Sequence, residues 1–580
     1  MKTKRELETS HNPARRNFFK TGVVATSAYV ITTKKSQAHG VDDGAVVVPV
    51  LPPSPATTPW MEELPVYPPK QPVDALTPEA HGFPGEYECG RVNHQAWGAF
   101  PPQKLYEMHV KQGQHNFHPQ YPTHTIWGYD GITPGPVFHN RYGTPIIVRI
   151  YNDLPANAQG PGTPEISTHL HNLHSPSESD GFPGDYFSAT RNGPTLTAPG
   201  FFKDHHYVNM YAGIDEFGGI GDSREALGTL WYHDHRLDFT GPNVLMGLAG
   251  FYLLFDDLDS GNEQDPAPAL GLPSGEYDIP IIFGDRRFDT GGNLFWDQLS
   301  PEGVLGDKVL VNGKIEPVLR VARRKYRFRL LDGGPTRYYE FYLVNQNDAA
   351  QTFTYIANDG NLLPAPLLNQ TKVRLGVAER GDIVVDFSRY PVGTQLYVVN
   401  RLLQDDTRGP KDVQSPGTRL LKIIVDRDPP KPDVSRVPSV LRPLRPLVQA
   451  ELAAAPVRRF EFARNNGLWM INNQLVNVNS PRMEINKGGG EIWELVNPSG
   501  GWSHPIHIHF EEGRILSRTK DGINVPVPPH ELGRKDVYVL GPTSTVRLFM
   551  RFRDFTGKYV MHCHNLVHED HAMMLRWDIK

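Results

Sequence analysis

The sequence predicts an all-β protein whose domains are sandwiches or barrels. Its 580 residues include 54 glycines and 53 prolines. Both exceed their average shares of about 7% and about 5%, which favours turns over long helices. Apolar and β-branched residues occur in short runs bounded by Gly, Pro, Asn or Asp, as in antiparallel sheets. No helical periodicity of useful length competes with this pattern, which argues against parallel α/β units.

The strand-length runs start at about residue 105 and continue to the carboxyl terminus. Each run ends at turn-forming residues, so each predicts one strand. The clearest of them are Pro145–Tyr151, Gly250–Phe255, Asp278–Phe283, Tyr326–Leu331, Asp382–Phe387 and Val546–Met550.

Two breaks in composition, at residues 264–275 and 426–446, divide the chain after its leader. The second break contains the sequence Asp-Pro-Pro-Lys-Pro, which is typical of a linker. The length of the chain suggests three or four domains at about 150 residues each. We therefore predict three β domains, at residues 79–260, 270–428 and 447–580.

The first residues have the layout of an export signal. A pair, Arg15 and Arg16, precedes two phenylalanines, a mildly apolar stretch at residues 21–33 and a small-residue site ending at Ala38. The apolar stretch is too short to span a bilayer, which needs about 20 residues. We predict a twin-arginine export signal over residues 1–38, and hence a periplasmic or extracellular protein. The alternative is a disordered basic tail.

Residues 39–78 are rich in proline and are expected to form an extended or poorly ordered arm. No later segment reaches membrane-spanning length, so no transmembrane segment is expected. The formal charge of −5, from 59 basic and 64 acidic residues, argues against nucleic acid as the main partner. Two cysteines in the whole chain exclude a disulfide scaffold. One of them, Cys89, is expected to be a buried thiol.

Histidine is distributed very unevenly. The 268 residues between His235 and His504 contain none of the chain's 24 histidines. Histidine is thus concentrated in the first and last predicted domains, and we expect its clusters to meet where those two domains touch. The four clusters are His169/His171, His233/His235, His504/His507/His509 and His562/His564/His568.

Each cluster contains a His-x-His pair, and residues i and i+2 of a strand project from the same face. A single pair of this kind is more often a hydrogen-bonded surface or core pair than a ligand pair. Four pairs supply eight imidazoles, which is more than one ion can bind. Imidazole suits copper, and copper(II) binds most tightly among the divalent ions. The pattern predicts a site for several copper ions.

Cys563 stands between two of these histidines and must point to the opposite face of its strand. A thiolate joined by His504, His568 and a weak thioether makes a blue-copper electron-transfer site. Met573 lies ten residues beyond the cysteine, which leaves room for one tight loop back to the ion. Simple apolar packing is the alternative for this methionine, and we expect its neighbour Met574 to belong to the core.

These motifs resemble those of the multicopper oxidases, three-domain cupredoxin proteins of the laccase type, and most of all the bilirubin oxidase and spore-coat laccase branch. The similarity also includes Trp127–Gly131 and Pro134–Pro136, and so covers most of residues 100–580. The resemblance implies three cupredoxin-like Greek-key domains and four copper ions. In this reading the second domain holds no copper and serves as a spacer.

The resemblance also implies a role for each ligand. His504, Cys563, His568 and Met573 would bind type 1 copper, and His169 and His507 would bind type 2 copper. The binuclear type 3 pair would be held by His171, His233, His235, His509, His562 and His564.

Three further residues take roles from the same resemblance. Asp180 matches an acid near the oxygen site, and Glu569 matches an acid that relays protons. Oxygen reduction consumes protons, so carboxylates near that site have a chemical purpose; either could instead be a hydrogen-bonded loop acid. Trp502 matches a tryptophan beside the type 1 histidine, where it could accept electrons from a donor or simply pack.

We therefore expect a monomeric oxidase. It would oxidise phenols, aromatic amines or bilirubin-like donors one electron at a time and reduce O2 to water. One alternative is an oxidase for Cu(I), Mn(II) or Fe(II), which needs carboxylates or thioethers near the type 1 site. The other alternative is a copper-binding or electron-carrier protein of the cell envelope without oxidase activity.

Overall fold

The computed structural model describes residues 52–73, 94–196, 202–297 and 300–580. The predicted export signal, residues 39–51 and 74–78 of the predicted arm, and Cys89 lie outside the described residues. Within the described ranges, no helix combines the length and the apolar character that a membrane crossing requires.

The described part of the arm, residues 52–73, lies extended along the surface. Its backbone forms hydrogen bonds of 3.0 Å from Trp60 to Glu316 and of 2.7 Å from Leu64 to Val318. Leu64 is buried in an apolar core that also contains Phe283 and Phe341. The arm is therefore an ordered edge of that core at these positions.

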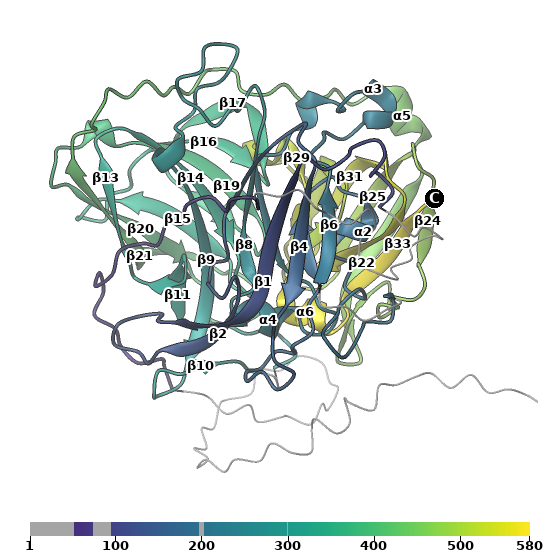
Figure 1. Cartoon of the computed structure of the whole chain (residues 1–580), viewed down its shortest axis with the longest axis horizontal. Coiled ribbons are helices and arrows are strands. Elements are labelled where there is room, and N and C mark those ends of the chain that lie inside the picture. Colours follow the sequence, from purple (N-terminus) through teal and green to yellow (C-terminus); the bar gives the residue numbers. More distant parts are fainter. Residues whose placement is uncertain (1–51, 74–93, 197–201, 298–299) are drawn as a thin grey trace, which may run out of the picture. The chain divides into compact units, whose positions relative to one another are not determined.

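The chain is mostly β, and its described strands form six sheets that fall into three pairs along the sequence (Figure 1). The predicted fold class is confirmed. All six of the clearest predicted runs coincide with strands, since their apolar residues face buried surfaces on one or both sides. Helices in the described ranges are short connections: α2 (Ser177–Asp180), α3 (Ile214–Phe217), α4 (Thr240–Met246), α5 (Gln449–Ala454) and α6 (Leu566–Asp570).

The first pair of sheets has the strand orders β2-β1-β4-β6 and β3-β8-β7-β5. Parallel pairing of β1 with β4 and of β3 with β8 requires crossings between the sheets, as in Greek-key sandwiches. The bounds are β1 (Lys104–His115), β2 (His124–Tyr129), β3 (Phe138–Arg141), β4 (Ile146–Asn152), β5 (Thr168–His171), β6 (Phe202–Tyr207), β7 (Thr229–Asp234) and β8 (Ala249–Phe255).

The second pair combines an eight-stranded sheet, β12-β11-β9-β14-β19-β16-β17 with β10 beside β9, and the five-stranded sheet β13-β21-β20-β15-β18. Its bounds are β9 (Asp278–Phe288), β10 (Leu294–Phe295), β11 (Lys308–Val311), β12 (Lys314–Ile315), β13 (Val318–Ala322), β14 (Lys325–Asp332), β15 (Tyr339–Val344), β16 (Phe353–Asn358), β17 (Asn361–Gln370), β18 (Val373–Leu375), β19 (Arg380–Asp386), β20 (Gln395–Leu402) and β21 (Val413–Arg427).

The third pair combines β23-β22-β25-β31-β27-β28, with β29 beside β27, and the sheet β24-β33-β32-β26-β30. Its bounds are β22 (Val457–Asn465), β23 (Leu468–Ile471), β24 (Met483–Ile485), β25 (Gly490–Asn497), β26 (His504–Ile508), β27 (Gly513–Lys520), β28 (Ile523–Val525), β29 (Arg534–Lys535), β30 (Val537–Leu540), β31 (Ser544–Arg551), β32 (Gly557–Cys563) and β33 (Met574–Ile579).

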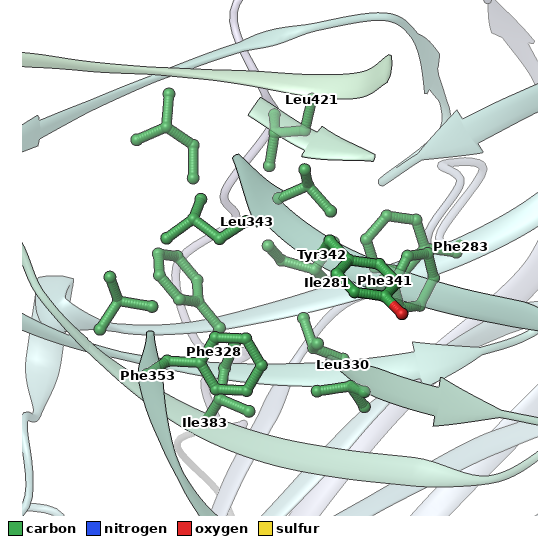
Figure 2. A pocket seen from close by; sticks show the side chains of 14 residues that line it. Ile281, Phe283, Phe328, Leu330, Phe341, Tyr342, Leu343, Phe353, Ile383 and Leu421 are labelled. Atoms are coloured by element: carbon green, nitrogen blue, oxygen red, sulfur yellow. The ribbon is translucent and has the colours of Figure 1, made fainter. Parts of the chain in front are cut away.

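A small cavity lies inside the core of the second pair (Figure 2). Its lining is apolar and includes Phe283, Phe328 and Phe341, which all belong to that core. The cavity contains none of the predicted site residues, so the functional site lies elsewhere.

The first and third pairs meet directly. Helix α2 contacts β32, and α4 contacts α6, which lies beside it in Figure 1. Helices α2 and α4 follow the two His-x-His pairs of the first pair of sheets, whereas β32 and α6 carry predicted ligands of the third pair. The contact therefore brings the histidine clusters of the two pairs close together.

Candidate metal centres

Strand register brings the histidine clusters together within the first pair of sheets and within the third pair. In the first pair β5 and β7 are antiparallel, and His169 lies opposite His233. In the third pair β26 and β32 are antiparallel, and His507 lies opposite His562. Opposed residues of neighbouring strands project on the same face, so each pairing aims its imidazoles at one place.

Three imidazoles from the first and third pairs of sheets form a triangle, here called the first trio: His235, His509 and His562. Their Nε2 atoms lie 3.1 Å apart for His235 and His562, and 3.3 Å for both other pairs. Two bonds of about 2.0 Å from one ion, set at a tetrahedral angle, place nitrogens about 3.3 Å apart. Three mutually facing nitrogens cannot all share protons with good geometry, whereas one cation satisfies all three.

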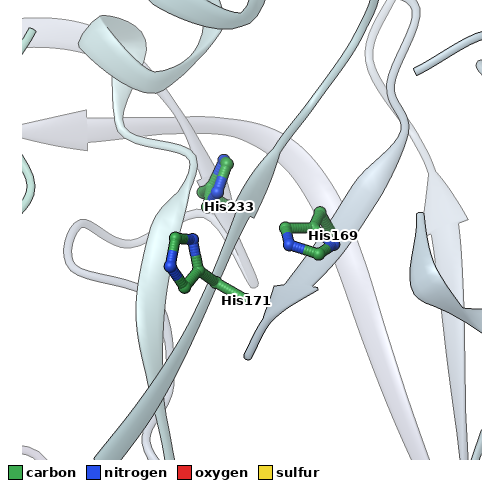
Figure 3. A group of neighbouring side chains, drawn as sticks. All are labelled: His169, His171 and His233. Carbon is green, nitrogen blue, oxygen red and sulfur yellow. The ribbon is translucent and has the colours of Figure 1, made fainter. Parts of the chain in front are cut away.

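A second trio consists of His171, His233 and His564, whose ring centroids are 5.2–5.8 Å apart. Figure 3 shows two of them, His171 and His233, beside His169. Nδ1 of His171, Nε2 of His233 and both ring nitrogens of His564 are buried without a hydrogen-bond partner among the described residues. Buried polar atoms rarely remain unpaired, so these nitrogens are available to a ligand or an ion.

The remaining two imidazoles, His169 and His507, form a pair whose Nε2 atoms are 3.4 Å apart. All eight imidazoles of the two trios and the pair are fully buried. Burial lowers the pKa of His233 to about 3 and holds that of His235 well below its ordinary value. Both rings are therefore neutral at neutral pH, which is the form that binds metal ions.

The predicted acid Asp180 contacts two of these rings. Its Oδ2 atom is 2.7 Å from Nδ1 of His509, and its backbone oxygen is 2.5 Å from Nδ1 of His169. Asp180 ends helix α2, and Gly181 follows with a φ of 88°. A Cβ atom at Gly181 would approach the backbone oxygen of Thr168 to 2.1 Å. The glycine thus lets the acid approach β5 closely.

The predicted acid Glu569, which follows the third pair's strand β32, faces two rings of the first trio. Its two carboxylate oxygens each lie 3.1 Å from an Nδ1 atom, one of His235 and one of His562. The acid is placed by α6, which Asn565 caps by accepting a 3.2 Å hydrogen bond from the amide of Val567. Such a cap stabilises the first turn of a helix.

Sequence reasoning missed a third acid, Asp536. Its Oδ1 atom is 2.8 Å from Nε2 of His171, and its backbone oxygen is 3.0 Å from Nδ1 of His507. Arg380 donates to both carboxylate oxygens, at 2.9 and 2.6 Å. Burial would raise the pKa of Asp536, but the guanidinium outweighs it and lowers the pKa. The available signal was the run of charged residues 534–536 directly before an apolar strand.

The cysteine belongs to a separate group, here called the thiolate group: His504, Cys563 and His568. Sγ lies 3.5 and 3.6 Å from the two Nδ1 atoms, which are 3.2 Å apart. A trigonal ion with bonds of about 2.3 Å to sulfur and about 2.0 Å to nitrogen places the sulfur about 3.7 Å from each nitrogen and the two nitrogens about 3.5 Å apart. Burial raises the pKa of the Cys563 thiol and lowers that of His504 to about 3. A bound cation would stabilise the thiolate.

The two candidate methionines pack in different places. Met573 is fully buried in the same apolar core as Cys563, and its backbone oxygen accepts a 3.0 Å hydrogen bond from the cysteine amide. Met574 packs with Phe182 and Val560 in another cluster. The position of Met573 is the one compatible with a thioether beside the thiolate group.

Two tryptophans and one carbonyl cover His568. The ring centroids of Trp469 and Trp502 lie 3.8 and 5.8 Å from that of His568. Trp502 is half-buried, whereas Trp469 is fully buried. Nε2 of His568 lies 3.1 Å from the backbone oxygen of Glu302, a residue that belongs to the second group of strands. Of these two tryptophans, Trp502 is therefore the one that solvent reaches.

Among the described residues, the potential ligand groups lie in this region. In the part of the chain that the structure describes, every set of three His, Cys, Asp or Glu side chains with ligand atoms within 4.8 Å lies here. A buried Cys-His-His set suits an electron-transfer copper, and imidazole sets suit copper as well. The residues present therefore fit copper.

Comparisons with known proteins agree with this chemistry. A family model described as "Multicopper oxidase" matches residues 450–580. A bilirubin oxidase of Albifimbria verrucaria is 33% identical over 517 residues, which cover 88% of this chain and 79% of that protein. The chain belongs to the multicopper oxidase family. A laccase of Bacillus subtilis is 32% identical, and the alignment covers 82% of this multicopper oxidase and 94% of the laccase.

Solved structures show the same fold. A variant of a multicopper oxidase from Aquifex aeolicus has a TM-score of 0.67 at 26% identity and covers 83% of this chain and 97% of its own. The cupredoxin-like character of the β domains is confirmed. This multicopper oxidase is a copper-dependent oxidoreductase that uses O2 as electron acceptor, and its family carries four copper ions: one type 1, one type 2 and two type 3.

Proposed function

We propose that this multicopper oxidase takes electrons from an organic donor at the thiolate group and reduces O2 to water among the eight imidazoles. The observation that carries the proposal is the position of Cys563 between His562 and His564. The thiol lies in one group of potential ligands while its covalent neighbours lie in the two trios. Electrons can therefore pass from one group to the other through a few bonds.

The ligand assignment follows the four sets of side chains: the thiolate group, the pair and the two trios. The thiolate group and Met573 would bind type 1 copper, the pair His169 and His507 type 2 copper, and the two trios the type 3 pair. Copper held there would supply one-electron oxidation of the donor and four-electron reduction of O2. The three sheet pairs support domains at residues 79–260, 270–428 and 447–580, which we also propose.

The protein's own residues exclude water and hold protons. All the assigned ligand side chains are buried. Asp180 and Glu569 contact the outer nitrogens of His509, His235 and His562. From there they can fix the orientation of these rings and deliver the protons that oxygen reduction consumes.

The donor is proposed to be a phenol, an aromatic amine or a bilirubin-like tetrapyrrole. The half-buried Trp502 beside His568 supports this class, because a flat aromatic donor can stack on an accessible indole. An oxidase for Cu(I), Mn(II) or Fe(II) would need further ligands near the thiolate group. Outside the assigned centres and Asp536, no group of three such His, Cys, Asp or Glu ligands occurs among the described residues.

An oxygen electrode tests the proposal with the copper-loaded protein and a panel of donors. Uptake of O2 with phenols or bilirubin, together with an intense copper–thiolate absorption band, is expected. Uptake with Cu(I), Mn(II) or Fe(II) alone would support a metal-ion oxidase instead. A blue protein with no uptake on any donor would support an electron carrier. We further propose that the protein acts as a monomer after export through the signal at residues 1–38.

A further inference from the structure

Arg380 lies where all three pairs of sheets meet. It begins β19 of the second pair and is fully buried. Its two terminal nitrogens donate to both oxygens of Asp536 in the third pair, at 2.9 and 2.6 Å. Its Nε atom donates to the backbone oxygen of Thr229 at 3.3 Å. Thr229 begins β7, the strand that carries His233. The Arg380 side chain therefore joins β7 of the first pair of sheets to Asp536 of the third pair.

Asp536 carries this contact to two imidazoles. Its Oδ1 atom lies 2.8 Å from Nε2 of His171 and 3.4 Å from Nδ1 of His507, and its backbone oxygen lies 3.0 Å from the same Nδ1. One of these rings comes from the first pair of sheets and the other from the third. A displaced Asp536 carboxylate would therefore release His171 and would remove one of the two contacts of Asp536 with His507.

The contacts occupy the outer nitrogens of both rings. Nδ1 of His171 has no hydrogen-bond partner among the described residues, and Nε2 of His507 faces Nε2 of His169 at 3.4 Å. A hydrogen bond at the outer nitrogen fixes the tautomer and the orientation of a ligand ring. Asp536 thus determines which nitrogens of these two rings remain for an ion.

The planar fork of an arginine is required to hold both carboxylate oxygens at once. A lysine keeps the charge but approaches as a single point and cannot also donate to the backbone of Thr229 in the same plane. The second pair contains another buried arginine, Arg327, which donates to Asp259 and Asp382. Among the described residues, Arg327 hydrogen-bonds to these two carboxylates and not to an acid that contacts the eight imidazoles. It therefore differs from Arg380 in position and not in kind.

We propose that Arg380 is a positioning residue of the imidazole site, which fixes His171 and His507 through Asp536 so that both present their inner nitrogens to copper. The second pair of sheets is then part of the copper site and more than the spacer that the sequence suggested. This inference rests on the proposed assignment of the eight imidazoles.

Copper binding to the full-length protein tests the proposal. The copper-free wild type, Arg380→Gln, Arg380→Lys and the matched control Arg327→Gln are each titrated with copper(II) by equilibrium dialysis. The electron paramagnetic resonance (EPR) signal of type 2 copper is recorded, with the blue absorption band as internal reference. For Arg380→Gln we expect copper affinity at the imidazole site to fall about 10–100-fold. We expect a changed type 2 signal and an unchanged blue band.

The other variants separate positioning from folding. Arg380→Lys is expected to show a smaller loss of the same kind, and Arg327→Gln to bind copper like the wild type. If Arg380→Gln does not fold, Arg380→Lys is compared with Asp536→Asn and with the double variant. A double variant no weaker than Asp536→Asn alone supports action through Asp536, and independent additive losses overturn it.

Three results contradict the inference, in two different ways. Unchanged affinity and an unchanged type 2 signal in Arg380→Lys and Arg380→Gln, or an equal loss in Arg327→Gln, overturn the positioning role alone. Absence of a type 2 signal in the fully loaded wild type overturns the proposed function and this inference together.

Discussion

Cys563 and His562 are consecutive residues whose side chains belong to different groups of potential ligands. Sγ of Cys563 faces Nδ1 of His504 at 3.5 Å, whereas Nε2 of His562 faces Nε2 of His235 at 3.1 Å. The strand geometry of β32 causes this separation, because successive side chains point to opposite faces.

Replacement of Cys563 by serine is expected to abolish the blue absorption band and to reduce donor oxidation to the level of copper-free protein. Serine is nearly isosteric but offers no soft thiolate. The eight imidazoles should still bind copper, which a type 2 EPR signal would verify. Persistence of the blue band in this variant would refute the assigned thiolate group.

Asp180→Asn is expected to slow oxygen reduction by about 100-fold or more, as for loss of a general acid or base. The amide preserves the shape of the side chain near His509 but carries no exchangeable carboxyl proton. Reduction by a donor, without O2, of copper bound at the thiolate group should be unchanged when it is followed in a stopped-flow instrument. An unchanged turnover would show that this acid only holds its loop.

Trp502→Ala is expected to lower kcat/KM for aromatic donors roughly 10-fold, about the size of one lost aromatic contact. Trp502→Phe retains a flat ring and should recover part of that loss. Oxidation of a small inorganic donor such as ferrocyanide serves as the control and should change less. Equal losses for aromatic and inorganic donors would assign Trp502 to packing around His568.

Copper removal is expected to lower the thermal stability of the protein. An ion that binds the folded chain only, present at about 1,000 times its dissociation constant, stabilises that chain by about 4 kcal/mol. Calorimetry of the copper-free and reloaded protein measures the difference in Tm. Equal Tm values would contradict tight binding at the buried ligands.

Acid is expected to destabilise the copper-free protein through Glu225. Burial would raise the pKa of this carboxyl, but Arg534 and Arg553 outweigh it and lower the pKa to about 2. Because the folded value lies below the unfolded one, the stabilisation is complete above about pH 4.5 and is lost as the pH falls toward 2. The ionised Glu225 carboxylate contributes about 3 kcal/mol to the free energy of unfolding. Urea unfolding of wild type and Glu225→Gln at pH 6 and pH 3 measures this contribution. A difference between the two proteins that is independent of pH would contradict this.

Sequence patterns predicted the strands and the four His-x-His pairs, because both depend on local periodicity. The role of each ligand came from the resemblance to the multicopper oxidases. The spacing of His169 and His171 puts both rings on one face of β5, whatever the rest of the chain does. Asp536 and Arg380 carry no such pattern. Their role arises only when β19 packs against the residue directly before β30. In the sequence, 155 residues lie between Arg380 and Asp536. Long-range packing of this kind is not encoded in spacing.

Anomalous X-ray diffraction at the copper edge from crystals of the loaded protein tests the central claim most directly. We expect four copper peaks: one bonded to Sγ of Cys563 and three among the eight buried imidazoles. A copper count below four in fully loaded protein, or no peak at the cysteine, would contradict the account.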